Sequence, residues 1–316
     1  MRVVVIGGGV IGLTTAVLLA ESGTVTDIRV WSRDRAEHTT SATAGAMWEP
    51  YKAHPQHLVN AWAQETFDVL QALSGQENTG IRMVGGIKVG RSGPPPTLWW
   101  RSITPVTPVP PTDLPHGFAW GLHATLPLVN MPLYLQYLLR RLADHDVTVE
   151  HRMVEHLTDA SPADLIINAT GLGARELAPD HEVIPVQGQL VIVENPGIHH
   201  WLVEATGGAA EGFYAFPRAD GTLILGGTAH ANRWSTVPDA DTTQRILERG
   251  SEVFPQLHAA RVIESRVGLR PYRPQVRLER QLLADGRPCI HCYGHGGSGV
   301  TVSWASAAAV LRLLHG

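Results

Sequence analysis

The glycine turn Gly7-Gly-Gly9-Val-Ile-Gly12 constrains the fold of this chain more than any other feature. It follows an apolar run at residues 3–6, typical of a buried parallel strand, and it opens an apolar helix over about residues 10–21. A G-x-G-x-x-G pattern in this position predicts a tight turn at the positive end of a helix, where backbone amides hold a dinucleotide pyrophosphate. With a second strand at residues 28–31, the chain opens as a β-α-β unit.

The turn does not identify the dinucleotide. An acidic residue at the end of the second strand would bind a ribose hydroxyl, and Asp34 lies close to that position. Arg33 precedes it and could accept the 2′-phosphate of NADP, so an NADP-dependent reductase is an alternative from another class. The cofactor-binding residues predicted in this region are Gly7, Gly9, Val10, Ile11, Gly12, Arg33 and Asp34.

Composition excludes several classes of protein. The net charge of -4 over 316 residues gives no reason to expect nucleic acid or an anionic membrane as a partner. No apolar run reaches the roughly 18 residues that span a bilayer, and we expect a cytoplasmic protein. Cys289 and Cys292 form a C-x-x-C pattern, but they fall in a predicted strand, which places the two thiols on opposite faces. We therefore expect buried thiols and no metal site.

Further elements suggest two interleaved domains. Helices are predicted over residues 55–73, 130–144 (with Asn130 as cap), 239–254 and 300–314. Strands are predicted at 147–154, 164–168 and 289–293, and a hairpin at 213–217 and 222–225, whereas the proline-rich stretch 92–115 is predicted to be a loop. The strands near residues 3, 28, 148, 165 and 290 suit a doubly wound sheet, with a second β-rich domain inserted in two pieces.

Four segments resemble D-amino-acid oxidases and their D-aspartate oxidase relatives, in family order over essentially the whole chain. They are residues 39–51 (TTSATAGAMWEPY), 168–171 (NATG), 268–280 (GLRPYRPQVRLER) and 293–301 (YGHGGSGVT). The resemblance implies an α/β fold in which a Rossmann-like FAD-binding domain (1–52, 146–185 and 262–316) interleaves with a β-rich, α+β substrate-binding domain (53–145 and 186–261).

The resemblance also implies an activity. It is the oxidative deamination of D-amino acids, neutral or basic, to 2-oxo acids, ammonia and hydrogen peroxide, by hydride transfer to FAD and reoxidation by dioxygen. Among relatives, D-aspartate oxidases would need an additional cation in the pocket, and glycine or sarcosine oxidases share the flavin fold. The implied partners are small molecules, and the chain is expected to be a monomer or a homodimer.

Arg270 is the central substrate residue that the resemblance implies. It precedes a proline, which favours an extended backbone, and its guanidinium offers a planar fork that matches a carboxylate. Its neighbours Arg266, Arg273, Arg277 and Arg280 are a warning, because a run of arginines is typical of a salt-bridged face. The resemblance assigns Tyr214 to the same carboxylate and the backbone carbonyl of Gly297 to the amino group. Tyr51 and Glu49 are expected to face the pocket, where the Glu49 carboxylate would favour basic side chains.

Other residues are assigned to the flavin. A glycine-rich loop at the start of the last helix offers amides that can stabilise negative charge on the reduced ring. The family's second pocket tyrosine has no counterpart in residues 206–212, and the chemistry requires no catalytic acid or base, so His295 is not assigned as one. The remaining predicted FAD contacts are Thr39, Thr40, Ser41, Ala46, Met47, Met153, Val154, Thr170, Gly171, Gly296, Gly297, Ser298, Gly299, Val300 and Thr301.

Overall fold

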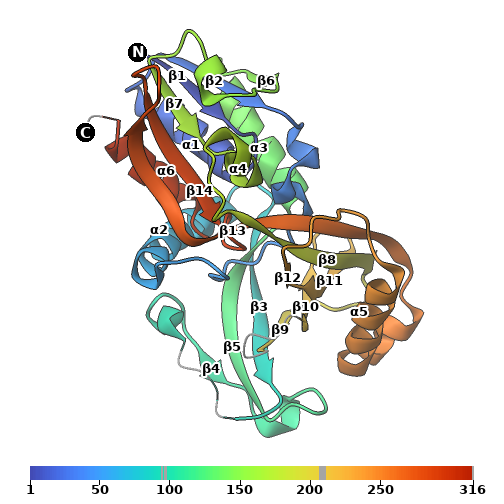
Figure 1. The fold of residues 1–316 in the computed structure, drawn as a ribbon. Helices are drawn as coiled ribbons and strands as arrows, with labels where there is room; N and C mark the ends of the chain where they lie inside the picture. The colour runs from blue at the N-terminus through green and yellow to red at the C-terminus, as the bar shows by residue number, and fades with distance from the viewer. Residues whose placement is uncertain (94, 96–97, 206–210, 315–316) are drawn as a thin grey trace.

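The computed structural model describes residues 1–93, 95, 98–205 and 211–314. One half of the molecule is a parallel sheet that contains the predicted β-α-β opening (Figure 1). Its order is β14-β7-β1-β2-β6, and every neighbouring pair in it is parallel. The strands are β1 (Arg2–Ile6), β2 (Asp27–Ser32), β6 (Val149–His151), β7 (Leu165–Asn168) and β14 (Pro288–His295). This confirms the predicted doubly wound half.

The other half is mainly antiparallel, with the order β4-β5-β3-β9-β10-β11-β8. The predicted hairpin is present as β10 (Glu211–Pro217) and β11 (Thr222–Thr228), and α5 (Ala240–Val253) packs against β8, β10 and β11. The other strands are β3 (Ile81–Gly90), β4 (Thr107–Pro108), β5 (Trp120–Val129), β8 (Ile184–Glu194), β9 (Trp201–Glu204) and β12 (His230–Ala231), which pairs with β8. The α/β fold with a β-rich second region is therefore confirmed.

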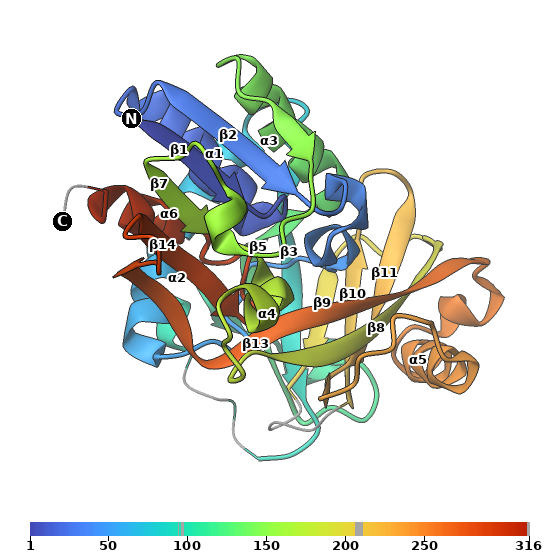
Figure 2. The same ribbon diagram turned by 45° about the horizontal axis from the view of Figure 1, so that its top comes forward.

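The long strand β13 (Val262–Leu282) joins the two halves. Its first part pairs with β8 and its second part with β14, so that all strands belong to one continuous sheet (Figure 2). Arg270 and Tyr272 lie where the strand passes from one neighbour to the other. The junction between the two halves is thus also the place of the predicted substrate arginine. The predicted domain boundaries remain a prediction.

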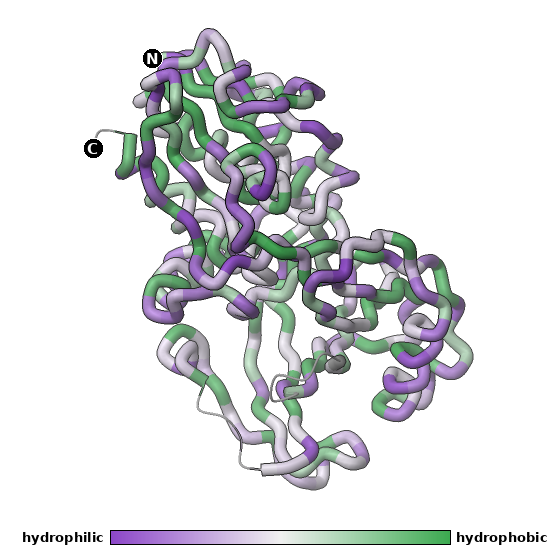
Figure 3. The backbone as a smooth tube through the Cα atoms, viewed as in Figure 1, coloured by the Kyte–Doolittle hydropathy of each residue, from purple (hydrophilic) through white to green (hydrophobic). Residues whose placement is uncertain are grey.

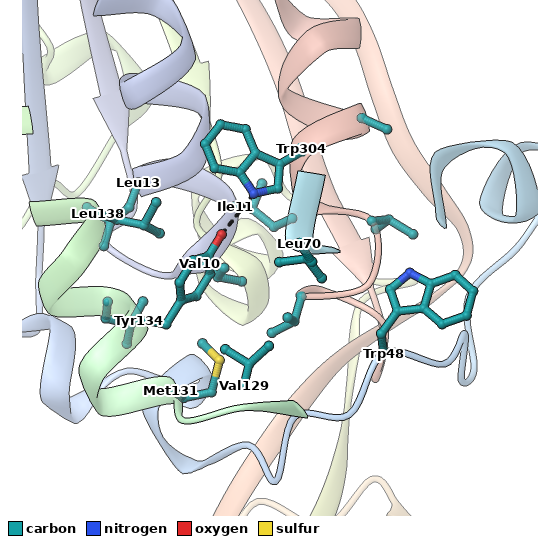
Figure 4. Close-up of a cluster of buried hydrophobic side chains, with 14 of the residues drawn as sticks. Val10, Ile11, Leu13, Trp48, Leu70, Val129, Met131, Tyr134, Leu138 and Trp304 are labelled. Atoms are coloured by element: carbon teal, nitrogen blue, oxygen red, sulfur yellow. Dashed lines mark hydrogen bonds between the residues drawn. The ribbon is translucent and has the colours of Figure 1, made fainter. Parts of the chain in front are cut away.

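Helices cover the sheet with apolar faces. In the parallel half, α1 (Val10–Ser22) packs against α3 (Met131–Ala143) and α6 (Ser303–Arg312), and α6 also contacts α2 (Gln56–Ser74). Apolar residues concentrate along the strands and inward helix faces, and polar residues along the surface turns (Figure 3). Two indole N–H groups in this core have buried partners. Trp304 donates to the Tyr134 hydroxyl at 2.9 Å (Figure 4). Trp48 donates to the Ala63 carbonyl at 2.9 Å.

Several local predictions differ from the structure. The last helix begins at Ser303 rather than near residue 300, because the glycine loop continues through a turn at Thr301. Asn130 occupies the N-cap position of α3 but makes no cap hydrogen bond, since its amide donates to Asp220 at 3.2 Å instead. The stretch predicted as a loop contains short elements: η3 (Trp99–Ser102), β4 and η4 (Pro111–Asp113).

The prediction of two buried thiols is confirmed. Cys289 and Cys292 are both free and fully buried, and they pack in different apolar clusters, as expected for opposite faces of β14. Burial raises the pKa of each thiol to about 12, which removes the thiolate needed for redox or metal chemistry. In the described part of the chain, none of the helices has the length and apolar character required to cross a membrane.

Candidate active site

The glycine turn forms a cradle at the start of α1. A Cβ atom on Gly12 would collide with the Gly7 carbonyl, and one on Gly7 would collide with the Ala169 carbonyl, so both positions require glycine for packing. Gly9 differs, because its Cβ would meet only the Ser41 hydroxyl, at 3.1 Å. The Val10 N–H donates to that hydroxyl at 2.9 Å. The helix begins without a side-chain cap and without an acid in its first turn, which fits an anionic pyrophosphate there.

Arg33 and Asp34 lie at the end of β2, beside this cradle. The two side chains form an ion pair with each other at 2.7 Å, and they are 68% and 39% exposed. The Ser32 hydroxyl donates to the Asp34 carbonyl at 2.6 Å and so fixes the turn that follows the strand. Because the pair neutralises both charges, these two residues alone do not separate FAD from NADP.

Residues 39–52, which we call the flavin segment, run from the cradle toward the other half. Thr39 precedes the short helix η2 (Thr40–Thr43), and Met47 forms a bridge with Leu128 of β5. Ala46 and Lys52 both have a φ of 51°, a left-handed conformation that is uncommon for residues other than glycine. Such outliers concentrate at functional sites, where the surrounding structure holds them in place.

The loop before α6 packs directly on this segment. The Ser298 side chain is fully buried, and its hydroxyl accepts from the Tyr51 N–H at 2.7 Å and donates to the Tyr51 carbonyl at 3.0 Å. The Gly297 N–H donates to the same carbonyl at 3.1 Å, and the Thr301 hydroxyl donates to the Glu49 carbonyl at 3.2 Å. The fold therefore brings together two predicted flavin-binding segments that lie about 250 residues apart in sequence.

The other predicted flavin contacts border the same region. A Cβ on Gly299 would be 3.6 Å from Val10, and Val300 lies in the same core cluster as Val10 and Ile11, which connects the loop to the cradle. A Cβ on Gly296 would collide with the Lys52 carbonyl, so only glycine fits there.

Thr170 and Gly171 lie just after β7. The Thr170 hydroxyl donates to Asn168 at 2.7 Å, and a Cβ on Gly171 would lie 3.6 Å from the Pro271 ring.

The predicted adenine contacts, Met153 and Val154, lie beyond the end of β6. Met153 is 71% exposed, whereas Val154 packs against the apolar cluster around Trp31.

Arg270 extends from β13 across the neighbouring strand. Its Nη1 donates to the Thr228 carbonyl at 3.0 Å, and its guanidinium passes so close to Gly188 that a Cβ there would collide with it. The guanidinium carbon is 5.7 Å from the centre of the Tyr51 ring. Because Gly188 of β8 has no side chain, the Arg270 side chain can lie against the sheet, between β8 and the flavin segment.

The neighbouring arginines differ from Arg270 in their partners. Arg266 pairs with Glu264 at 2.5 Å, Arg273 with Asp180 at 2.9 Å and with Glu182 at 2.5 Å, and Arg277 with Glu279 at 2.7 Å. Within residues 1–93, 95, 98–205 and 211–314, no acidic side chain forms an ion pair with Arg270. The salt-bridged face expected of an arginine run is thus present in these three residues. Arg280 has no ion pair among the described residues either, but it is exposed, whereas Arg270 is half-buried.

Tyr214 completes the cluster. Its ring rests on Gly226 and Gly227, where a Cβ at either position would be too close, and it stacks on Phe216 with centroids 4.6 Å apart. Burial raises the pKa of the Tyr214 hydroxyl, and the nearby Arg270 charge offsets part of that rise. The hydroxyl therefore stays protonated and can donate a hydrogen bond beside the guanidinium.

Two predicted residues have partners of their own. Glu49 forms an ion pair with Lys88 of β3, in which the side chains are 19% and 16% exposed, so the carboxylate already has a cation. His295 is buried, with Nε2 at 3.4 Å from the Ser306 hydroxyl, and burial lowers its pKa to about 4. The segment without a second tyrosine, residues 206–210, lies outside the described residues.

Sequence reasoning missed some supporting residues. It assigned no role to Gly188 or Phe216, and it placed Ser298 near the flavin without finding that the hydroxyl holds Tyr51. An isolated glycine in an apolar strand does signal a close approach, and Gly188 lies in such a strand. What approaches it depends on the pairing register with β13, which the sequence does not contain.

The family model described as FAD dependent oxidoreductase, DAO, matches residues 2–313. The chain belongs to this family. It is 46% identical over 313 residues to a D-amino-acid oxidase of Streptomyces coelicolor, covering 99% of this chain and 96% of the relative. It is 44% identical over 314 residues to a D-amino-acid oxidase of Rubrobacter xylanophilus and 33% identical over 327 residues to the human D-aspartate oxidase, and covers 95% and 94% of these relatives.

Solved structures of other oxidases share the fold. A glycine oxidase of Geobacillus kaustophilus superposes with a TM-score of 0.81 at 19% identity, with 99% of this chain and 94% of that chain covered. An L-α-glycerophosphate oxidase of Mycoplasma pneumoniae with FAD bound superposes with a TM-score of 0.79 at 16% identity, with 100% and 94% covered.

Membership in the DAO family decides the cofactor. FAD is the cofactor of this FAD-dependent oxidoreductase, and the alternative of an NADP-dependent reductase, which rested on Arg33, is wrong. The glycine cradle and the open side of Gly9 fit the FAD pyrophosphate.

Proposed function

We propose that this protein is a D-amino-acid oxidase. It converts a D-amino acid, dioxygen and water into a 2-oxo acid, ammonia and hydrogen peroxide. Support comes from the two D-amino-acid oxidases to which it is 46% and 44% identical over nearly their full lengths. The substrates are D-amino acids with uncharged side chains, and the basic class is less favoured because Lys88 already pairs with Glu49.

One observation carries the proposal: Arg270 is the half-buried member of its arginine run that pairs with no acid among the described residues, whereas Arg266, Arg273 and Arg277 are paired and Arg280 is exposed. A half-buried guanidinium that lacks an internal carboxylate is a site for an external one. Tyr214 lies within range of its charge and offers a hydroxyl donor to the same carboxylate. Together they form a clamp for the carboxylate of an amino acid.

The protein positions the substrate and stabilises the charge that develops during the reaction. Arg270 and Tyr214 fix the substrate carboxylate, and the Gly297 carbonyl accepts from the amino group. With the carboxylate and the amino group fixed, the α-hydrogen and the side chain fill the two remaining positions on the α-carbon. These two exchange between enantiomers, so only one enantiomer presents the α-hydrogen to the reacting face. FAD, when bound, accepts the electrons and the α-hydrogen and passes the electrons to dioxygen. The backbone amides of the loop before α6 would stabilise the negative charge that a bound flavin gains on reduction.

Replacement of Arg270 tests the clamp. We expect Arg270→Ala to lower kcat/KM for a neutral D-amino acid about 100-fold or more, mainly through KM, because a lost charge-assisted pair costs about 2–5 kcal/mol. Arg270→Lys keeps the positive charge but lacks the planar fork, so its kcat/KM should lie between that of Arg270→Ala and that of the unmodified protein. Arg280→Ala, an exposed residue of the same strand, is the matched control. Peroxide release with D- and L-amino acids is the measurement, and unchanged kinetics of Arg270→Ala would refute the assignment.

A D-aspartate oxidase is the second candidate, supported by the 33% identity to the human enzyme. It requires a second cation for the side-chain carboxylate. Lys88 is a candidate for this cation, and Glu49 neutralises its charge. A panel of D-amino acids separates the two candidates, since D-aspartate should be a poor substrate here.

The setting of the enzyme is also part of the proposal. We propose a cytoplasmic monomer or homodimer, supported by two free and buried cysteines, which agree with a reducing compartment. Light scattering of the purified protein distinguishes the two oligomeric states.

A further inference from the structure

An ion pair lies on the same sheet face as the carboxylate clamp. Lys88 of β3 is in register with Val203 of β9, and Val203 is in register with Tyr214 of β10. Residues in register on neighbouring strands point to the same face of a sheet, so the Lys88 and Tyr214 side chains share one face. With strands about 4.8 Å apart, Lys88 lies about 10 Å from Tyr214 along this row.

The order of the strands places the pair beyond the clamp. Along the sheet, β3 lies on one side of β10, and β13 with Arg270 lies on the other side. Tyr214 therefore stands between Arg270 and Lys88. If the side chain of a substrate held by Arg270 and Tyr214 points away from Arg270 along this face, it points toward Lys88.

Glu49 reaches this place from the flavin segment. It lies two residues before Tyr51, whose ring is 5.7 Å from the Arg270 guanidinium carbon, and its own carbonyl is held by Thr301. The Glu49 carboxylate contacts the Lys88 ammonium. The pair thus connects the segment that carries Tyr51 to the sheet face that carries Tyr214.

The charges of the pair are balanced. Both side chains are less than one-fifth exposed, and the register neighbours of Lys88 are Val203 and Leu122, both apolar. Among the residues that the structure describes, neither Glu49 nor Lys88 has a second ionic partner. A buried pair of this kind presents no net charge, whereas one member left alone is an uncompensated charge that attracts a counter-ion.

We propose that the Glu49–Lys88 pair forms the far wall of the substrate pocket and sets its preference for D-amino acids with uncharged side chains. The inference rests on the proposed function. Each member masks the selectivity of the other, because Glu49 alone would attract basic side chains and Lys88 alone would attract acidic ones.

Two single variants test the masking. Lys88→Met leaves Glu49 unpaired, and we expect the ratio of kcat/KM for D-arginine to that for D-norvaline to rise at least 10-fold. Glu49→Gln leaves Lys88 unpaired, and the ratio for D-glutamate to D-norvaline should rise at least 10-fold. Should Lys88→Met lose its flavin, Lys88→Gln carries the same expectation. Absorbance at 450 nm relative to 280 nm reports the flavin content.

Two double variants separate charge from packing. The reversed pair, Glu49→Lys with Lys88→Glu, should restore the ratios of the unmodified protein, whereas Glu49→Gln with Lys88→Met should favour neither charged substrate. Arg91→Met is the matched control, because it removes an ion pair with Glu204 of β9, at the surface end of β3. Its ratios should equal those of the unmodified protein.

The outcomes distinguish the two levels of the proposal. If the unmodified protein releases no peroxide with any D-amino acid, the proposed function fails. If it is active on D-norvaline but the flavin-loaded single variants keep its substrate ratios, the pair does not face the substrate side chain and the inference is overturned. Opposite shifts in the two single variants, cancelled in the reversed pair, support it.

Discussion

At the scale of single residues, the site depends on small side chains that make room for large ones. The Arg270 guanidinium lies over Gly188, the Tyr214 ring lies on Gly226, and a Cβ on Gly297 would meet both the Tyr51 ring and the Arg270 side chain. Each glycine is ordinary in its own strand or loop. What makes it necessary is the side chain that arrives from another element.

Gly188 gives a prediction about this packing. Gly188→Ala places a methyl group where Nη1 of Arg270 lies, so the guanidinium must move. We expect KM for a neutral D-amino acid to rise about 10-fold or more, in line with the cost of misplacing a substrate-binding group, with normal flavin content. Gly75→Ala is the control, because its Cβ would be at 3.6 Å from the nearest atom. Steady-state kinetics that do not distinguish the two variants would contradict the packing argument.

The site residues that could be predicted from sequence are those that stand in a short local motif with a recognisable chemical role. Arg270 stands in a G-x-R-P motif, and the loop at residues 293–301 has glycines at the start of a helix. Gly188, Phe216 and the Ser298–Tyr51 hydrogen bonds could not be predicted, because each depends on a contact with a distant segment. The Glu49–Lys88 pair has the same origin, since it joins a loop residue to a strand.

At the scale of elements, β14 carries two buried histidines. Burial lowers the pKa of His291 and of His295 to about 4 each, well below the ordinary value of about 6.5. Both are therefore neutral in the folded protein at pH 6, whereas the unfolded chain takes up protons as the pH falls below about 6.5. Stability contributed by the two rings is complete above that pH and is lost as the pH falls toward 4.

This titration predicts an acid-sensitive fold. Between pH 7 and pH 5, His295 alone should reduce the free energy of unfolding by about 2 kcal/mol, at about 1.4 kcal/mol per pKa unit. His295→Gln removes this proton uptake and should flatten the dependence of Tm on pH. Tm measured with excess FAD at pH 7, 6 and 5 checks this. Parallel curves for the variant and the unmodified protein would show that the ring is not buried in its neutral form.

The start of α1 gives a second prediction at this scale, because its glycines have different roles. Gly12→Ala drives a methyl group into the Gly7 carbonyl and should lower the Tm of the apoprotein and abolish FAD binding. A Cβ on Gly9 meets only Ser41, and Gly9 has an extended backbone that any residue adopts, so Gly9→Ala should leave the apoprotein Tm nearly unchanged. It should nonetheless weaken FAD binding at least 10-fold, measured by fluorescence titration, because the pyrophosphate approaches this side. If Gly9→Ala bound FAD as tightly as the unmodified protein, the assignment of the glycine turn as the pyrophosphate site would be wrong.

At the scale of the whole molecule, one sheet connects the cofactor and substrate regions. The β-α-β opening and the parallel strands could be predicted from sequence, since buried strands and helix periodicity are local signals. The continuity through β13 could not, because it depends on a 21-residue strand that changes its neighbour near Tyr272. That continuity places the Arg270 clamp where the two halves meet, against the flavin segment and the loop before α6.

The most direct test of the central claim is anaerobic reduction of the bound flavin by the two enantiomers of one neutral amino acid. With D-norvaline, the absorbance near 450 nm of the unmodified protein should bleach rapidly, and with L-norvaline it should persist. Arg270→Ala should keep the same initial flavin spectrum but require a much higher D-norvaline concentration to bleach. Bleaching by both enantiomers, or none by any D-amino acid, would contradict the account.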